Sequence, residues 1–389
     1  MPRRRIGRLF PALPQGFFGG PAACAIDFLV TFQCRPWSYC VHDVHTCVTF
    51  VQVKREYLGT LNQADPIYNI LSHDVLPQLG VTTNGQRYRV FRLGGSNAVF
   101  EYEERESGHR VIGKFYGESG TRASPRAVDR MWREYRAVDH MRRVGLDGYP
   151  HHVMRALGTA PDQGAAIFLE HLRGETLGVV LDGVAREVRP PSALYERLTA
   201  LAFFLATMHN RTVTDDLVDF HDDVRYLGLL SESLRHHRHM GDQSLREFGS
   251  LGDRWKRFGP MWEDHRVCLH GDATPANFLF TDGMWVGGID FERSHYGDRV
   301  FDVGRIAGEL QHAFMLNQGN RRGAEPYIGH FLWEYSCHFP DRDAAFAHIC
   351  ARVPFHLATT LLRVARNPWI TNEYRTKLIE AARDALRSL

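Results

Sequence analysis

The pattern of hydrophobic and polar residues changes character near the middle of the chain. In the first half, three short runs, residues 88–93, 98–102 and 110–116, alternate apolar and polar side chains and are joined by brief polar or glycine-rich turns. Such alternation with tight connections is typical of strands that pair in succession. We therefore expect an antiparallel meander here, extended by two more strands at 153–158 and 165–169.

Helical spacing of apolar residues appears before, between and after these strands. A short helix is predicted for residues 67–79, and a long one follows Pro125, with Met131, Tyr135, Val138 and Met141 on one face. Beyond Gly174 the pattern is mostly helical. One expected helix has Leu194, Leu198, Leu201, Leu205 and Met208 at helical spacing, and the last helix begins at about Asn372. Short strands at 277–280 and 286–289 interrupt this helical region.

These patterns predict an α+β chain in two lobes. Residues 63–172 form a small antiparallel β-rich N-lobe and residues 173–389 a mostly helical C-lobe, with the hinge near Glu170-His171-Leu172. Residues 1–62 read as an extension whose apolar run is broken by prolines, glycines and Asp27. We expect this extension to be partly disordered or to lie upstream of the true start.

Composition narrows the class of protein. The chain has 389 residues, and 47 Lys and Arg balance 45 Asp and Glu to give a net charge of +2. A dedicated nucleic-acid or acidic-membrane binder would carry a strong basic excess, so neither partner is expected. No run approaches the roughly 20 apolar residues of a membrane span. Disulfide frameworks belong to short secreted chains, so the seven cysteines are expected to be reduced thiols in a cytoplasmic protein. The four cysteines near the N-terminus include no C-x-x-C pair, so no zinc site is expected there.

The strongest chemical signal is the segment that begins at His270-Gly271-Asp272. Asn277 follows five residues after Asp272, and Asp290 follows a short hairpin. The spacing H-x-D-x-x-x-x-N is the catalytic-loop pattern of kinases. In such chemistry Asp272 would accept the proton of the acceptor hydroxyl, and Asn277 with Asp290 would offer the hard oxygen ligands that Mg²⁺ prefers.

Two residues near this loop have a supporting interpretation. We expect His270 to brace the loop through hydrogen bonds rather than to transfer protons. Asp302, in Gly297-Asp298 to Val303, would support the loop from a following helix, or would simply be a carboxylate at a helix start.

Three upstream segments could hold a nucleotide. Lys114 lies inside a strand and needs a partner if it is buried, and Glu134 on the next helix is the natural one. The turn Gly94-Gly95-Ser96 would let backbone N–H groups approach phosphates, or is an ordinary hairpin turn. The connector that contains Glu170 and Leu172 could offer backbone groups to an adenine edge, or is a plain linker.

These motifs, and their order along the chain, resemble those of the aminoglycoside phosphotransferase and choline kinase-like family. That family has the protein-kinase-like fold. The resemblance covers roughly Tyr88 to Ala307 and rests most on His270 to Asn277 and Ile289 to Glu292. It implies that Lys114 pairs with Glu134 and binds phosphates, that Asp272 is the catalytic base, and that Asn277 and Asp290 bind Mg²⁺. The chain departs from protein kinases in its incomplete glycine motif and in lacking an A-P-E segment after Asp290.

The sequence thus predicts an ATP- and Mg²⁺-dependent kinase whose partner is a small-molecule hydroxyl acceptor. An aminoglycoside, a choline-like amine, a sugar or an amino-alcohol each fits. An acidic run at residues 215–223 and the aromatic residues Phe331, Trp333, Tyr335 and Trp369 are candidate acceptor determinants, although such a run is more often a solvated loop and such aromatic residues are more often core. The alternatives are a catalytically silent nucleotide-binding regulatory module of the same fold and a metal-dependent hydrolase.

Overall fold

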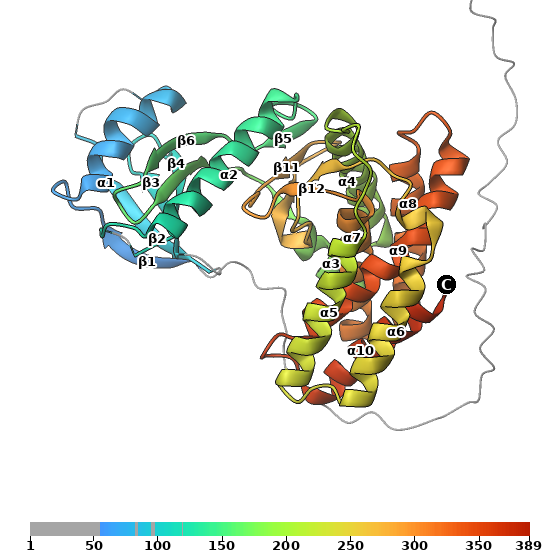
Figure 1. Ribbon diagram of the computed structural model, residues 1–389. Coiled ribbons are helices and arrows are strands. Elements are labelled where there is room, and N and C mark those ends of the chain that lie inside the picture. The colour runs from blue at the N-terminus through green and yellow to red at the C-terminus, as the bar shows by residue number, and fades with distance from the viewer. Residues whose placement is uncertain (1–54, 82–84, 95–97, 119) are drawn as a thin grey trace, which may run out of the picture. The chain divides into compact units, whose positions relative to one another are not determined.

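A six-stranded antiparallel sheet forms the first lobe. The structure, a computed structural model, describes residues 55–81, 85–94, 98–118 and 120–389, all within the unit His42–Leu389. The sheet confirms the predicted meander. It also contains a first strand, at Glu56–Thr60, within residues 1–62, which the sequence analysis assigned to the N-terminal extension. In spatial order the strands are β1 (Glu56–Thr60), β2 (Tyr88–Leu93), β3 (Ala98–Glu104), β4 (Arg110–Phe115), β7 (Ala166–Glu170) and β6 (Ala156–Ala160) (Figure 1).

Helices cover both faces of this sheet, and strand alternation decides which side chain meets which helix. On one face, Phe115 and Phe168 pack with Leu71 and Val75 of a helical segment. This segment runs through α1 (Pro66–Asn69), the π-helical η1 (Ile70–Val75) and the 3₁₀ turn η2 (Leu76–Leu79). Lys114, one residue before Phe115, therefore points to the opposite face, on the side of α2 (Pro125–Arg143). That helix begins at Pro125, with Ser124 as its N-cap.

A second, smaller sheet contains strands from both lobes. The run 153–158, predicted as one strand, divides into β6 and the preceding β5 (His151–Val153), because β5 leaves the first sheet and pairs in parallel with β11. The order in this sheet is β5, β11 (Val286–Gly288), β10 (Phe278–Phe280) and β8 (Glu175–Thr176). A two-stranded ribbon pairs β9 (Val267–Leu269) with β12 (His295–Gly297). The segment between β9 and β12 carries the predicted catalytic loop.

Helices build the rest of the second lobe, as the sequence predicts. Helix α7 packs against α3, α8 and α9, while α10 packs against α6 and α9 (Figure 1, yellow to red). The helices are α3 (Leu177–Ala185), α4 (Pro191–Arg211), α5 (His221–His236), α6 (Asp242–Lys256), α7 (Val300–Gln318), α8 (Glu325–Ser336), α9 (Arg342–Ala365) and α10 (Asn372–Arg387). Short 3₁₀ turns are η3 (Gly259–Met261), η4 (Pro275–Asn277) and η5 (Arg321–Ala324). The α+β, two-lobed architecture is the one expected.

Two general expectations can be compared with the described part of the chain. Cys268, Cys337 and Cys350 are free thiols. Across residues 55–389, outside the undescribed gaps, no helix has the length and apolar character needed to cross a bilayer.

Candidate active site

Lys114 is held among three carboxylates that come from both lobes. Its Nζ lies 3.1 Å from Oε2 of Glu134 on α2, 2.6 Å from Oδ1 of Asp290 and 3.2 Å from Oε2 of Glu292. The Lys114 side chain is only 6% exposed. Burial disfavours its charged form, but the three carboxylates outweigh burial and hold the pKa of Lys114 above its usual range. The lysine is therefore a permanent cation at this position.

The same group carries an excess of negative charge. One ammonium faces three carboxylates, and the hydroxyl of Tyr116 also donates to Glu134. Arg130 offsets part of the charge, since its Nη2 lies 3.5 Å from Oε2 of Glu292. Buried like charges are costly unless a cation neutralises them. The group is thus suited to accept a further cation.

Asp290, two residues after the end of β11, has an unusual backbone conformation. Its φ is +64°, in the left-handed region that Asp tolerates better than most residues but still at some cost. This turn directs the carboxylate of Asp290 at Lys114 of the other lobe, and the side chain keeps 36% exposure. A strained residue that remains accessible at a charged site is a candidate ligand.

Asp302, at the start of α7, holds the predicted catalytic loop in place through hydrogen bonds to its backbone. It is fully buried and accepts hydrogen bonds from the backbone N–H groups of His270, at 2.7 Å, and Gly271, at 3.1 Å. Burial opposes its ionisation, but the hydrogen bond and charge of His209 and the His270 N–H outweigh it, so the pKa of Asp302 is lowered. The predicted support from a following helix is confirmed.

The loop conformation itself depends on Gly271 and His270. Gly271 has φ of +77°, and a Cβ there would lie 2.1 Å from the carbonyl oxygen of Arg293, so no other residue fits. His270 is buried, its Nε2 donates to the carbonyl of Ile289 at 3.0 Å, and its Nδ1 accepts from the Asp272 N–H at 3.3 Å. His270 therefore braces the loop, as the sequence predicts, and has no ring nitrogen left for a metal.

Asp272 is positioned by a buried arginine that the sequence pattern did not indicate. Nη1 of Arg305, on α7, lies 2.7 Å from Oδ1 of Asp272, and the Arg305 side chain is 4% exposed. Nε of Arg293 is 3.9 Å from the other carboxylate oxygen. Because Oδ1 is engaged by Arg305, Oδ2 is the oxygen that remains for an incoming hydroxyl.

Asn277 and Asp290 can supply two oxygen ligands to a magnesium ion. Nδ2 of Asn277 donates to the backbone carbonyl of Asp272 at 2.9 Å, which directs Oδ1 of Asn277 the other way. Mg²⁺ is usually bound by one or two protein oxygens together with waters and substrate phosphates, not by a full protein cage. The described residues contain no group of three His, Cys, Asp or Glu side chains arranged to enclose a metal. The donor set and the excess negative charge fit Mg²⁺.

The predicted nucleotide-binding residues are only partly brought together. Gly95 and Ser96 lie outside the described residues, and Gly94 is an exposed residue at the end of β2. The Glu170 N–H donates to the carbonyl of Arg155, and its carboxylate accepts from the Arg155 N–H and from His152. Both groups are thus already engaged.

Leu172 lies in the hinge and packs against the second sheet. A Cβ added to Gly287 of β11 would meet Cδ1 of Leu172 at 2.9 Å. The hinge therefore rests directly on the strand that leads to Asp290.

The candidate acceptor determinants do not gather into one site. Phe331 and Tyr335 are fully buried in the core, whereas Trp369 is 64% exposed and Trp333 stacks under Arg342. In the acidic run, Asp219 pairs with His221 and Asp222 contacts Arg225, and both aspartates are exposed. Core packing and a solvated surface explain these residues.

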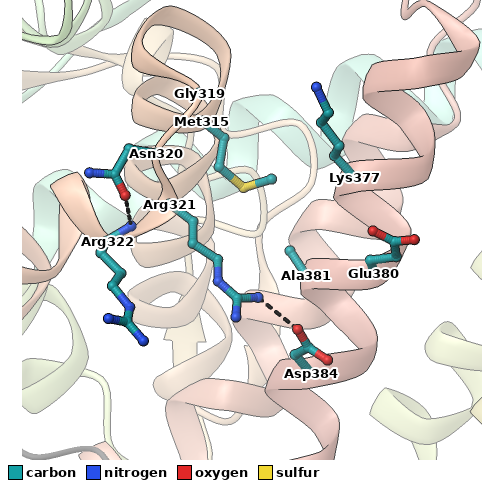
Figure 2. A pocket seen from close by; sticks show the side chains of 9 residues that line it. All are labelled: Met315, Gly319, Asn320, Arg321, Arg322, Lys377, Glu380, Ala381 and Asp384. Atoms are coloured by element: carbon teal, nitrogen blue, oxygen red, sulfur yellow. Dashed lines mark hydrogen bonds and ion pairs between the residues drawn. The ribbon is translucent and has the colours of Figure 1, made fainter. Parts of the chain in front are cut away.

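A surface hollow of about 450 Å³ lies elsewhere in the second lobe, between the end of α7, η5 and α10. Figure 2 shows Arg321 reaching across it to Asp384, at 2.8 Å, with Lys377 and Glu380 on the same side as Asp384. Its cations and carboxylates nearly balance, and none of its lining residues is among the predicted site residues.

Comparison with known proteins identifies relatives of this arrangement. The family model described as phosphotransferase enzyme family matches residues 87–333. An ethanolamine kinase from Plasmodium vivax is similar in structure, with a TM-score of 0.54 at 12% identity over 81% of this chain and 86% of that one. A choline kinase from Cryptosporidium parvum Iowa II has a TM-score of 0.53 at 14% identity, over 82% and 92%. Among curated protein sequences, none matches significantly.

A third solved structure is a ternary complex of streptomycin, ATP and APH(2″)-IIa. It has a TM-score of 0.50 at 13% identity and covers 84% of this chain and 97% of that one. At these identities the likeness concerns the fold, which is the kinase-like, two-lobed one that the sequence predicts.

Proposed function

The chain belongs to the phosphotransferase enzyme family, and on that premise we propose that it is an ATP-dependent kinase that phosphorylates a hydroxyl group of a small molecule. The observation that carries the proposal is the contact between Lys114 and Asp290. It brings a buried cation suited to phosphates and an exposed carboxylate suited to a metal to within 2.6 Å of each other. A cytoplasmic location, which supplies ATP, is part of the proposal.

In the proposed reaction the acceptor hydroxyl oxygen attacks the γ-phosphorus of ATP. The bond between that phosphorus and the β–γ bridging oxygen breaks, ADP leaves, and Oδ2 of Asp272 takes the hydroxyl proton. Asp272 needs only to orient the hydroxyl and accept its proton late, since phosphoryl transfer depends mainly on positioning and charge stabilisation.

The other residues bind and orient the nucleotide. Lys114, held by Glu134, would contact phosphate oxygens, and the turn Gly94-Gly95-Ser96 would cover them with backbone N–H groups. Asn277 and Asp290 would hold Mg²⁺, which supplies charge neutralisation on the phosphates when bound.

For the hinge, we propose that Leu172 forms an apolar contact with the base. Its packing on β11 supports this role. Glu170 would contribute through its backbone carbonyl, because its N–H and its carboxylate are bonded to Arg155 and His152.

Two measurements test the proposal. Calorimetry with Mg-ATP should give saturable binding, and a coupled assay of ADP release should report turnover with a panel of hydroxyl-bearing metabolites and antibiotics. A phosphorylated product identified by mass would establish transfer to the acceptor rather than to water. Nucleotide binding without turnover on any acceptor would favour the silent regulatory module instead.

A further inference from the structure

A line of buried polar side chains runs from α8 through α4 to the start of α7. The hydroxyl of Tyr335 on α8 lies 2.8 Å from Nδ1 of His209 on α4, and Nε2 of His209 lies 3.3 Å from Oδ2 of Asp302 on α7. All three side chains are fully buried. We refer to Tyr335, His209 and Asp302 as the buried chain, which joins three different helices.

The buried chain ends on the backbone of the predicted catalytic loop. Oδ2 of Asp302, the oxygen that faces His209, also accepts from the His270 N–H at 2.7 Å, and Oδ1 accepts from the Gly271 N–H at 3.1 Å. The next residue along the chain is Asp272, which takes the hydroxyl proton in the proposed reaction. The position of His209 is therefore transmitted to Asp272 through the Asp302 carboxylate and the two N–H groups that this carboxylate holds.

The chemistry of its members fixes the direction of each hydrogen bond in the buried chain. An ionised carboxylate only accepts hydrogen bonds, so Nε2 of His209 carries a proton and donates to Asp302. Burial, helped by the charge of Arg299, outweighs the attraction of Asp302 and lowers the pKa of His209, so the ring holds a single proton near pH 7. Burial also raises the pKa of Tyr335, whose hydroxyl keeps its proton. Nδ1 of His209 is therefore an acceptor, and the Tyr335 hydroxyl donates to it.

Tyr335 thus favours one of the two neutral forms of the His209 ring. A proton on Nδ1 instead of Nε2 would leave a lone pair of the ring facing the Asp302 carboxylate, which is repulsive. The Tyr335 ring packs edge-on against the His209 ring, with centroids 5.9 Å apart, and lies 5.5 Å from the ring of Phe339. These contacts hold the Tyr335 hydroxyl in place, and a buried network whose members are all bonded is rigid.

We propose that His209 and Tyr335 are positioning residues for the phosphoryl transfer. Tyr335 holds His209 with its proton on Nε2. His209 in this form orients Asp302, and Asp302 holds the loop that presents Asp272. The effect on turnover rests on the proposed kinase function, whereas the protonation of the ring and the order of the loop are properties of the resting protein. The competing explanation is a buried polar contact that only stabilises the core.

Tyr335→Phe removes the donor, keeps the ring and tests the effect on turnover. We expect kcat to fall about tenfold, the effect of one hydrogen bond, while the Kd of Mg-ATP changes less than about twofold because Lys114 and Asp290 are untouched. Tyr327→Phe, at a buried tyrosine of α8 outside the buried chain, is the matched control and should change neither quantity. An unchanged kcat in folded Tyr335→Phe, even with lower stability, overturns the inference in favour of the competing explanation.

Two variants of His209 test its role as a donor. The amide of His209→Gln can donate to Asp302, so this variant should retain more of kcat than His209→Phe, which has no donor. Equal kcat values for the two folded variants contradict the role of the Nε2 proton. If His209→Phe does not fold because Tyr335 loses its partner, the double variant with Tyr335→Phe takes its place in the comparison.

Two measurements on the resting protein need no turnover. The ¹⁵N shifts of the histidine rings, with the His209 signal identified by its absence in His209→Gln, should show a neutral ring protonated on Nε2 at pH 7. Amide exchange of residues 267–275, followed by mass spectrometry, should be about tenfold faster in Tyr335→Phe than in the parent. A ring protonated on Nδ1 or on both nitrogens, or unchanged exchange, overturns the inference. If the parent binds Mg-ATP but phosphorylates no acceptor, the kinase proposal fails and these two measurements alone decide the inference.

Discussion

Nζ of Lys114 lies 2.6 Å from Oδ1 of Asp290, although 176 residues separate them in the chain. Lys114 comes from the first sheet and Asp290 from the end of β11 in the second. The contact is therefore the point at which the proposed phosphate-binding and metal-binding halves of the site meet. The contact between Lys114 and Asp290 can therefore form only when both lobes are folded.

Replacing Lys114 should weaken both stability and nucleotide binding. In Lys114→Met, the carboxylates of Glu134, Asp290 and Glu292 lose their shared cation, and breaking a buried ion pair costs about 3–5 kcal/mol. Urea unfolding should show a loss of this order, and calorimetry should show weakened Mg-ATP binding. Lys377→Met, at an exposed lysine of α10, is the control and should change neither quantity. Unaltered Mg-ATP affinity in a folded Lys114→Met variant would contradict the proposed phosphate contact.

Asp272→Asn should abolish most turnover while the fold survives. The amide cannot take the hydroxyl proton, and such a loss typically costs about 10²–10⁴-fold in rate. Initial rates of ADP release with an acceptor found in the panel of hydroxyl-bearing molecules would measure the effect, and circular dichroism would check the fold. Asp282→Asn, at an exposed position in the hairpin between β10 and β11, is the matched control. Turnover of Asp272→Asn equal to that of the parent would refute the role of Asp272.

Asp302→Asn should loosen the catalytic loop from α7. The parent carboxylate accepts from two backbone N–H groups and from His209, whereas an amide offers one acceptor oxygen and places its NH₂ against a donor. Charge-assisted hydrogen bonds contribute about 1.5–3 kcal/mol. Unfolding free energy should fall by roughly that amount and kcat should fall with it, while the exposed Asp343→Asn leaves both unchanged. A full retention of kcat would show that the loop keeps its shape without this support.

Acidification should destabilise the protein in part through His356. This residue of α9 is fully buried, and burial, reinforced by the charge of Arg352, lowers its pKa to about 4. Because an unfolded histidine titrates near pH 6.5, the unfolded chain binds a proton that native His356 does not. The contribution is complete above about pH 6.5 and is lost as the pH falls toward 4, by about 3 kcal/mol.

Unfolding free energies of the parent and of His356→Gln, measured from pH 7 to 4.5, isolate this contribution. The variant should show a shallower decline than the parent. His265→Gln, at an exposed histidine, should follow the parent curve. Parallel curves for the parent and His356→Gln would contradict the lowered pKa of His356.

The parts of the site that were predictable are those with a local signature. The strand period places Lys114 opposite Phe115, and the loop spacing identifies Asp272, Asn277 and Asp290, because these depend on residues close in sequence. Strand β5 could not be recognised, since its partner β11 lies more than a hundred residues away and a three-residue run has no period of its own. Strand β1 was missed for a related reason: it pairs at the sheet edge with a register shift near Gly59.

Two charged residues at the site were not predicted, although weak signals existed. Glu292 follows Asp290 by two positions, inside the motif Ile289 to Glu292, but the motif assigns it no role. Arg305 lies three residues after Asp302, a spacing that puts both on one face of α7. That spacing indicates a shared face, but only the tertiary arrangement shows that the face meets Asp272.

The pairing of β5 with β11 makes the two lobes inseparable as modules. The chain enters the second sheet through β5 before it returns to complete the first sheet with β6 and β7. A cut at the hinge would carry β5 away with the first lobe and leave an unsatisfied edge beside Asp290. Lobes expressed separately, or exchanged between family members, should therefore be unstable, because residues 151–153 lie between α2 and β6 in the chain but pair in the second sheet.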